Sequence, residues 1–560
     1  MKGMYKIFTA LIGITCSSWI FGQSPQVQDQ QYAVHGWQLM DYRENGIYGA
    51  GVSKAYRDLL KGKKSHVVVV AVIDGGIDTA HEDLVGHIWT NTKEIPGNGI
   101  DDDHNGYVDD VHGWNFLGNP DGRNISEESY EVYREYYRLR QLLSGIPDAI
   151  FTDTAENDYW VKIRKRFLKD SLRQAQTVFK VGQMIPRMEV TDSILKTALH
   201  KDSVYARDLE KMEPSDSVTG VARKNGLQYF RKYWITPEMT LEKFIGEAEK
   251  YLVGAKLALK SYSDDPNALR REIVGDDFNN INDRNYGNNN ISAGDHTHGT
   301  HVSGIIAASR NNGTGINGIA GHVLIMSVRT IPDGDERDKD VALAIRYAVD
   351  NGALIINMSF GKYFSPGKRW VDEAVRYAEL HDVLLVHSAG NDESDNDSVP
   401  TYPNPHYKAL NSRSGSFITV GASGGGPDSL IMPRFSNYGK KEVDLFAPGV
   451  KIYSTVPGNQ YETFSGTSMA APIVSGVAAL LLEYYPRLSA RQLKYVLIHS
   501  VMKLPDAKVK LASNGKTVDF GSLSSAGGIV NAYNALKLAA TLHGERGKTL
   551  RMKRIQTKRD

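Results

Sequence analysis

The chain has 560 residues, 41% of them hydrophobic, which is enough for several domains with apolar cores. Its formal net charge of +1 gives no overall attraction to nucleic acid or to an anionic membrane. Cys16 is the one cysteine, so the chain beyond it has neither a disulfide nor a thiolate metal site.

Residues 1–22 have the composition of a secretory signal peptide. Lys2 and Lys6 form a basic start, residues 7–21 are mostly apolar but too short to span a bilayer comfortably, and Gly22 is small enough for cleavage. This predicts an exported protein, periplasmic, at the cell surface or secreted, with no membrane span after signal removal. A signal anchor and lipidation of Cys16 are the alternatives. Residues 23–65 are polar and predict an N-terminal arm or a short pro-segment.

Residues 66–73 form a continuous β-branched run that is followed by Asp74 and two glycines. Such a run is typical of a central parallel strand buried on both faces. Asp74 then falls at the carboxyl end of that strand, the edge at which open α/β sheets build their sites. Asp74 is therefore a candidate functional carboxylate, with an ordinary turn aspartate as the alternative.

An acidic loop follows, in which oxygen-bearing residues recur at every second position: Asp101, Asp103, Asn105, Tyr107 (through its carbonyl) and Asp109. Alternating oxygens around the turn at Gly106 suit Ca²⁺, which takes six to eight oxygen ligands. The twelfth position is His112 and not a bidentate Glu, so the calcium loop is incomplete. We therefore weigh a structural Ca²⁺ site against an acidic loop of Asx turns.

Residues 119–287 predict a mostly helical subdomain. The expected helix signals are Ser126 with two acids after it, a periodic stretch at 160–179, and Thr236-Pro237 ahead of apolar residues at helical spacing over 241–259. The subdomain is rich in Tyr, Lys and Arg, which we interpret as solvated helix faces and not as a nucleic-acid surface.

Three histidines, His296, His298 and His301, precede a small or apolar run. No carboxylate ligand follows at metalloprotease spacing, so a zinc site is disfavoured. A general base suits a histidine here, because its unperturbed pKa lies near neutrality.

From residue 288 to 542 the pattern alternates between strands and helices and predicts βαβ units with a parallel sheet. The predicted strands are 323–328, 354–358, 383–387 and 417–422, and the predicted helices between them are 339–350 and 368–381. Polar or glycine-rich residues follow the strand ends. Residues 543–560 are basic and predict a disordered tail.

Ser468 lies in Phe464–Pro472, among small residues and ahead of an apolar segment that is long enough for a buried helix. A serine at a helix start lies beside unpaired N–H groups and the positive end of the helix dipole. Pro472 comes about one turn into this helix and is expected to bend it without ending it.

Three short motifs contain the candidate residues Asp74, His298 and Ser468, in this order along the chain: Val72–Asp78, His298–Gly304 and Gly466–Pro472. This order of Asp, His and Ser on an α/β pattern resembles the subtilisin-like serine proteases, the subtilases. The resemblance implies an α/β, three-layer fold with a mainly parallel central sheet flanked by helices. That fold would be built from residues 66–118 and 288–542 and interrupted by the helical insertion at 119–287, which is expected to restrict or recruit substrate.

The resemblance also implies roles for individual residues. Ser468 would be the nucleophile of a serine endopeptidase, His298 the general base, Asp74 its partner, and Asn391 the oxyanion-hole side chain. The implied substrate-binding residues are Ser359, Phe360, Gly361, Ser388, Ala389 and Gly390. Substrates would be proteins or peptides, and no cofactor is needed for the chemistry. A peptide cyclase or transpeptidase and an inactive binding scaffold are the alternatives.

Overall fold

The structure is a computed structural model that describes residues 35–144, 154–233, 235, 239–260, 264–426 and 431–547. It divides into two compact units, each described here by itself. The helical unit is Glu128–Ala268, which lies inside the 119–287 stretch predicted from composition. The α/β unit comprises the described residues of Gln23–Glu127 and Leu269–Asp560. The predicted signal peptide at 1–22 lies outside the described residues.

Nine of the described strands form one sheet in the α/β unit, in the order β12-β15-β9-β8-β5-β4-β1-β3-β2. All neighbours are parallel except β12 and β15. The strands are β1 (Val68–Asp74), β2 (Gly113–Asn115), β3 (Val323–Arg329), β4 (Ile355–Met358), β5 (Leu384–Ser388), β8 (Phe417–Ser423), β9 (Leu445–Pro448), β12 (Met502–Lys503) and β15 (Gly528–Ile529). Short antiparallel pairs are β6 (His406–Tyr407) with β7 (Ser412–Arg413), β10 (Ile452–Val456) with β11 (Gln460–Phe464), and β13 (Lys508–Lys510) with β14 (Thr517–Asp519).

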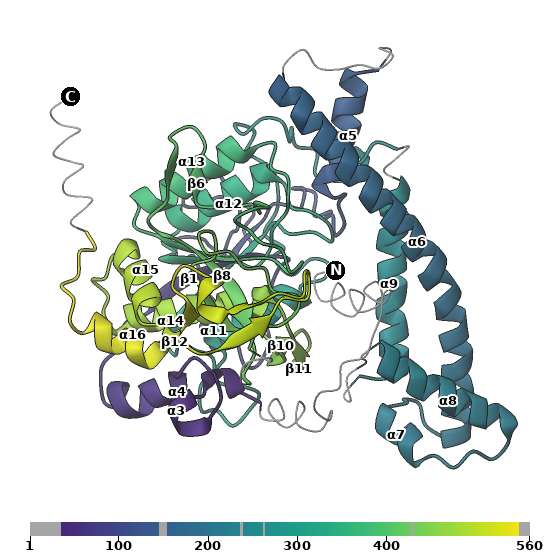
Figure 1. The fold of residues 1–560 in the computed structure, drawn as a ribbon. Coiled ribbons are helices and arrows are strands. Elements are labelled where there is room, and N and C mark those ends of the chain that lie inside the picture. The colour runs from purple at the N-terminus through teal and green to yellow at the C-terminus, as the bar shows by residue number, and fades with distance from the viewer. Residues whose placement is uncertain are drawn as a thin grey trace. The chain divides into compact units, whose positions relative to one another are not determined.

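Helices cover both faces of this sheet (Figure 1). The α-helices of this unit are α3 (Tyr42–Asn45), α4 (Val52–Ala55), α11 (Thr297–Ala307), α12 (Asp338–Asp350), α13 (Lys368–Leu380), α14 (Thr467–Tyr484), α15 (Ala490–His499) and α16 (Ala532–Ala539), and α10 (Ala268–Ile273) begins at the last residue of the helical unit. Short helical turns are η1 (Trp37–Leu39), η2 (Tyr56–Leu60), η3 (Val85–His87) and η5 (Phe520–Ser522).

The core explains the β-branched run of β1. Val68, Val70 and Val72 pack in the cluster that contains α11 and α14, whereas Ala71 and Ile73 pack in the cluster that contains α12 and α13. Successive side chains of a strand point to opposite faces, so a strand between two helical layers needs apolar residues throughout. The predicted α/β fold with a mainly parallel sheet between helices is confirmed.

The helical unit has a core of its own. Its helices are α5 (Glu131–Leu142), α6 (Thr154–Leu199), α7 (Ala206–Lys211), α8 (Ser217–Lys232) and α9 (Leu241–Lys260). One apolar cluster joins α6 to α7, α8 and α9 through residues such as Met188, Leu209 and Phe244. At the other end of α6, Phe167 stacks on Tyr136 of α5, with ring centroids 3.7 Å apart. The unit therefore buries apolar surface independently of the sheet.

Three predicted boundaries differ from the structure. The helix expected to open at Ser126 begins at Glu131, because Glu127 is paired with Asp333 in a parallel bridge. Thr236 and Pro237 lie outside the described residues, and α9 begins at Leu241, where the Thr240 hydroxyl accepts a hydrogen bond from Lys243 N.

The predicted disordered tail also begins too early at residue 543. Arg546 donates to the carbonyls of Leu488 and Asp382, so residues 543–547 are fastened to the α/β unit. Residues 548–560 lie outside the described part of the chain.

Residues 35–64 pack on the α/β core as an arm. Trp37 is 1% exposed and joins the cluster that contains α14, together with Ala50 and Val52. Trp37 Nε1 donates to the Lys451 carbonyl at 3.4 Å, and Asn531 lies near Asp41. The arm thus contacts segments from the far end of the chain.

Helix α14 runs through the centre of the unit. Among the described residues it is the one helix long and apolar enough to cross a membrane, and 94% of it is buried inside the protein, as a core helix would be. Pro472 lies within α14 and does not end it, as predicted. Near the carboxyl end of α14, Glu483 is 1% exposed and accepts a hydrogen bond from His322 N at 2.7 Å.

Burial raises the pKa of Glu483 to about 7, against backbone hydrogen bonds that lower it. The folded protein therefore keeps this proton more strongly than the unfolded chain, and stability should fall as pH rises from about 4.5 to about 7 and then level off. We expect Glu483→Gln, which is neutral and keeps the acceptor, to remove about 3 kcal/mol of that pH dependence. Chemical denaturation of both proteins between pH 4.5 and 8 measures it; parallel curves would contradict it.

Candidate active site

Asp74 is the last residue of β1 and is 3% exposed. Its Oδ1 accepts a hydrogen bond from Gly75 N and lies 2.8 Å from Nδ1 of His298. A carboxylate accepts from Nδ1 when that nitrogen carries the hydrogen, which leaves the lone pair of a neutral imidazole on Nε2. That Nε2 is buried and has no hydrogen-bond partner in the described part of the chain.

Arg329 anchors the backbone that directly follows Asp74. This guanidinium is 1% exposed, and its Nε donates to the Gly75 carbonyl at 3.1 Å. Its other nitrogens donate to Asn115 Oδ1 and to the Ile125 carbonyl, both at 2.9 Å. Burial lowers the pKa of Arg329 to about 10, so the side chain still carries its charge at neutral pH.

His298 is the second residue of α11, and α11 is packed against the end of β1. Gly299 faces the loop so closely that an added Cβ would overlap the Gly76 carbonyl oxygen and lie 3.2 Å from Asp74 Cβ. The Thr300 hydroxyl accepts from Asp78 N at 2.9 Å. One turn further, Nε2 of His301 donates to the carbonyls of Ile452 and Glu462 in β10 and β11.

Ser468 is the second residue of α14 and is 4% exposed. Its Oγ donates to the Ser359 carbonyl at 3.0 Å, and its own carbonyl accepts from Ser359 Oγ at 2.9 Å. Ser359 Oγ also accepts from Asn357 Nδ2, while Asn357 Oδ1 accepts from Ser475 Oγ, about two helical turns after Ser468 along α14. These reciprocal bonds join the start of α14 to the end of β4.

Asn391 lies beside the start of α14. Its Oδ1 accepts from Thr467 N at 2.9 Å and from Thr467 Oγ1 at 3.0 Å, so this side chain caps the helix in place of Gly466. The bonded oxygen leaves Nδ2 as a donor without a partner among the described residues. The N–H of Ser468 likewise has no acceptor there, as is usual in a first helical turn.

The segment before Asn391 is strongly constrained. Ala389 N donates to the Val420 carbonyl, and its carbonyl accepts from Asn396 and Asn437 at 3.0 Å each. Gly390 has φ of +110°, and a Cβ there would overlap Asn437 Nδ2. Ser388 and Ala389 are buried, and the N–H and the carbonyl of Ala389 are both bonded inside the protein, so neither side chain of this predicted substrate segment lies at the surface.

The predicted substrate segment at the end of β4 divides into buried and exposed parts. Ser359 is fully buried, and the Phe360 side chain, 2% exposed, packs in the core with α12 and α13. The Phe360 carbonyl accepts from His387 Nε2 at 2.7 Å. Gly361 is exposed, so the structure places Gly361, and not the Phe360 ring, at the surface.

The acidic loop brings together only part of the predicted calcium set. Carboxylate oxygens of Glu94, Asp101 and Asp103 lie within 4.8 Å of one another. Asp109 points elsewhere: its two oxygens accept from the N–H groups of residues 97–99. Asn105 Oδ1 accepts from Tyr107 N. The converging carboxylates therefore differ from the predicted set: they include Glu94, which lies outside the alternating pattern, and they do not include Asp109.

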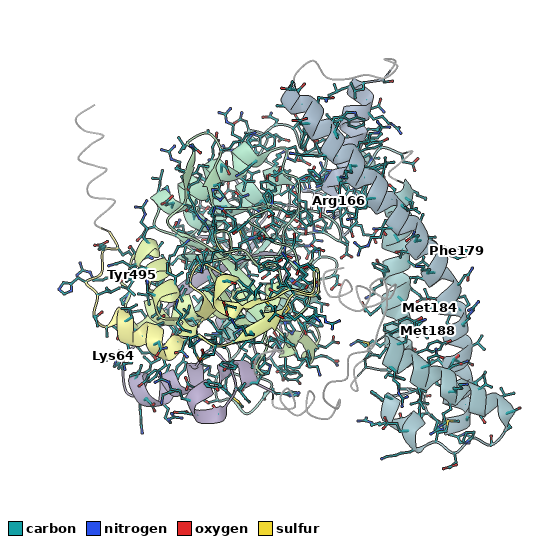
Figure 2. All side chains as sticks on the ribbon, in the orientation of Figure 1. Lys64, Arg166, Phe179, Met184, Met188 and Tyr495 are labelled. Atoms are coloured by element: carbon teal, nitrogen blue, oxygen red, sulfur yellow. The ribbon has the colours of Figure 1, made fainter. Side chains whose placement is uncertain are left out.

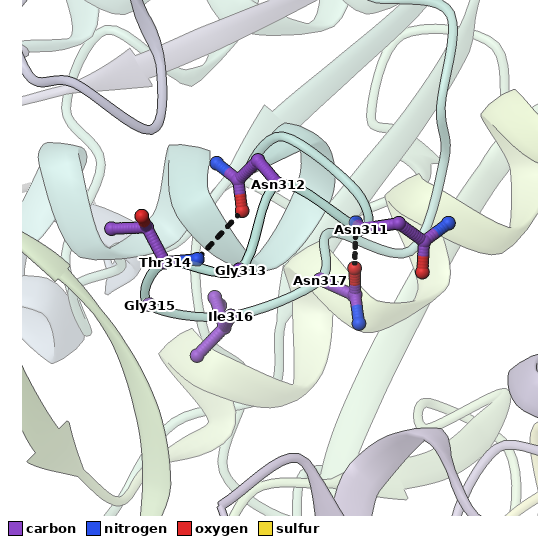
Figure 3. Close-up of a pocket in the computed structure, with 7 residues that line it drawn as sticks. All are labelled: Asn311, Asn312, Gly313, Thr314, Gly315, Ile316 and Asn317. Atoms are coloured by element: carbon purple, nitrogen blue, oxygen red, sulfur yellow. Dashed lines mark hydrogen bonds between the residues drawn. The ribbon is translucent and has the colours of Figure 1, made fainter.

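A separate pocket lies in the loop of residues 311–317 that follows α11 (Figure 3). Asn312 Nδ2 and Ile316 N donate to the buried carboxylate of Asp83, and Asn317 Oδ1 accepts from Asn311 N. None of the predicted site residues lines this pocket.

The sequence model of the Subtilase family matches residues 65–522, which is more than half of the chain. The chain belongs to the subtilase family. It is 36% identical over 364 residues to the thermophilic serine proteinase of Bacillus sp. (strain AK1), covering 64% of this chain and 79% of that protein. It is 37% identical over 232 residues to thermitase of Thermoactinomyces vulgaris, covering 41% and 75%. A solved cold adapted subtilisin-like serine proteinase is 30% identical, with a TM-score of 0.33 over 42% of this chain and 74% of that one.

The protein is accordingly a subtilisin-like serine endopeptidase that acts on proteins or peptides. In this subtilase, Asp74 and His298 are brought into contact across 224 positions of sequence. Residues that only position others, such as Arg329, Asn357 and Asn437, carry no motif of their own. Their signal is burial of a polar side chain, which becomes visible only in the folded structure.

We expect Gly299→Ala to lower kcat at least tenfold, because the new methyl group must displace the start of α11, and His298 with it, from the end of β1. The variant should also unfold at a lower temperature. Gly246→Ala is the matched control, since it too lies inside a helix but its Cβ would meet nothing within 4 Å. That control should gain about 0.5–1 kcal/mol of stability and keep full activity. Full activity in Gly299→Ala would contradict the packing argument.

Proposed function

We propose that this subtilase hydrolyses peptide bonds through an acyl-enzyme formed on Ser468, with His298 as general base and Asp74 as its partner. The observation that carries the proposal is the 2.8 Å contact of Asp74 Oδ1 with His298 Nδ1, because it leaves Nε2 as a proton acceptor. The first step forms a bond from Ser468 Oγ to the substrate carbonyl carbon while the hydroxyl proton passes to Nε2. The same proton then goes to the leaving amine as the C–N bond breaks, and water repeats the sequence to release the acid.

The Ser468 hydroxyl must turn before it reacts. In its resting position it donates to the Ser359 carbonyl at 3.0 Å. Rotation about the Cα–Cβ bond to another staggered position would direct it to His298. The backbone of Ser468 would stay in place through this rotation, because its carbonyl remains bonded to Ser359 Oγ.

Asn391 Nδ2 and the N–H of Ser468 are the proposed donors to the oxyanion. Both lie at the first turn of α14, and Asn391 is oriented by the two bonds from Thr467 to its Oδ1. Donors that are fixed in advance stabilise the charge that develops on the carbonyl oxygen without reorganisation. The positive end of the α14 dipole favours the same charge.

Export is part of the proposal. It is supported by the basic start and short apolar run of residues 1–22, and by a relative named the halolysin-like extracellular serine protease Nep of Natrialba magadii. The final compartment would be the periplasm, the cell surface or the medium.

The deciding experiment combines a fluorophosphonate probe with peptide cleavage. The probe should label the protein at Ser468, and Ser468→Ala should lose both the label and turnover. Product masses separate hydrolysis, which adds water, from transpeptidation or cyclisation, in which an amine takes the acyl group. An unlabelled protein that cleaves no peptide would fit the inactive scaffold and overturn the proposal.

Asn391→Ala serves as the matched variant, because it keeps the nucleophile. In this same protease family the loss of such a donor costs about 10²–10³ in kcat, and we expect a similar loss here. Thr467→Ala controls for the capping bond: it removes one of the two bonds to Asn391 Oδ1, together with the bond that the hydroxyl accepts from Gly390 N, but leaves Nδ2. It should cost about 1 kcal/mol of stability and much less in kcat.

We further propose that Glu94, Asp101 and Asp103 hold a structural Ca²⁺. Their three carboxylates converge, and Lys93, at 3.7 Å from Asp103, is the one cation paired with any of them among the described residues. A hard divalent cation would relieve their mutual repulsion and supply the loop with a rigid centre. The backbone carbonyl of Tyr107 and the side chain of Asn105 remain the further candidate ligands from the sequence pattern.

Calcium should then stabilise the folded enzyme relative to EDTA, by about 2.7 kcal/mol at a free concentration a hundred times Kd. Glu94→Gln should remove most of this gain, which thermal unfolding with and without Ca²⁺ measures. Asp109→Asn is the contrast, because its carboxylate is not one of the three that converge and its oxygens accept from the amides of residues 97–99: it should destabilise the protein equally in both buffers. Equal unfolding temperatures of the parent enzyme in Ca²⁺ and EDTA would contradict the site.

A further inference from the structure

Helix α6 of the helical unit is apolar on two opposite sides. One side is buried in the core of the unit and includes Phe167, Val181 and Met188, whose exposures are 0–3%. The other side carries five large apolar residues that are half or more exposed: Val161 (53%), Leu168 (50%), Leu172 (62%), Phe179 (65%) and Val190 (61%). Figure 2 labels Phe179 on this side, and Met184 and Met188 on the buried side.

The first four of these residues form one straight stripe. They are separated by seven, four and seven positions, so at 3.6 residues per turn they lie within about 40° of one another. At about 1.5 Å per residue the stripe from Val161 to Phe179 is about 27 Å long. An ordinary surface helix has a single apolar face, directed to its core, so a second, aligned stripe indicates a contact outside the unit.

The stripe is flanked by cations. Residues 161–187 contain eight Lys or Arg and one acid, Asp170. Five of the cations lie on one side of the stripe, between about 40° and 100° from its middle: Lys162, Lys165, Lys169, Lys180 and Arg187. All five are exposed, and none forms an ion pair with any residue that the structure describes. Their charge is therefore available to an anionic partner.

We propose that this face of α6, the stripe with its cationic flank, binds the surface of an anionic phospholipid membrane. The apolar side chains of the stripe would enter the boundary between headgroups and acyl chains, while the neighbouring Lys and Arg would contact the lipid phosphates.

Other partners fit this face less well. A second copy of the chain would bring two positive flanks together, and their repulsion disfavours a dimer through this face. Nucleic acid would use the cations but give no reason for four exposed aliphatic and aromatic side chains. The surface is distinct from the catalytic residues, all of which belong to the α/β unit.

The test is cosedimentation of the full enzyme with phosphatidylcholine vesicles that contain or lack phosphatidylglycerol. The enzyme should bind the anionic vesicles and not the neutral ones. The variant Leu172→Ser with Phe179→Ser should bind about tenfold more weakly for each side chain removed. Lys165→Gln with Lys169→Gln should bind about fivefold more weakly per charge at low salt. Val218→Ser with Val221→Ser on α8 is the matched control, because those valines are equally exposed but do not belong to the stripe. This control variant should bind anionic vesicles as well as the parent does.

Peptide cleavage in solution should be unchanged in all of these variants, which shows that they are folded. Three results would overturn the proposal. The first is failure of the parent enzyme to sediment with anionic vesicles. The second is binding of the Leu172 and Phe179 variant as tight as that of the parent, which would leave only a nonspecific charge effect. The third is loss of a concentration-dependent dimer in the same variant, which would make the stripe an interface between copies of the chain.

Discussion

The site depends on the burial of β1 between two helical layers. Because β1 lies between β3 and β4 and is covered on both faces, its carboxyl end is fixed by packing and not by local turns. The position of Asp74 at that end is therefore fixed. Gly299 has no side chain, so α11 packs close enough to β1 for His298 to contact the Asp74 carboxylate. Parallel strands bring their carboxyl ends to one edge, so Ser359, directly after β4, and Ser388, the last residue of β5, lie at the same edge of the sheet.

A second set of constraints holds Ser468 in place. Helix α14 is a buried apolar core helix, so its position is set by the sheet it crosses, and its first turn is set by polar contacts. Ser359 and Ser468 exchange hydrogen bonds, and Asn391 takes the place of a capping side chain that Gly466 lacks. Buried polar groups of this kind are costly unless they are paired, so each bond also excludes other arrangements.

The helical unit follows different rules. It is inserted between Asp74 and His298 in sequence, yet its apolar residues form a separate cluster, so the α/β core does not need it in order to bury its own side chains. An insertion with its own core is free to carry surface chemistry unrelated to the reaction. The cationic and apolar face of α6 is of that type.

The sequence by itself determined the fold class and the family and supplied three candidate catalytic residues in order, because β-branched runs, helical spacing and short motifs are local signals. It predicted Asp74, His298 and Ser468, and the structure brings Asp74 and His298 into contact. Only the tertiary structure decided which oxygens of the acidic loop converge, that the Phe360 ring is buried, and that Arg329 and Asn437 support the site. These depend on contacts between segments distant in the chain, and a linear pattern does not record where such segments meet.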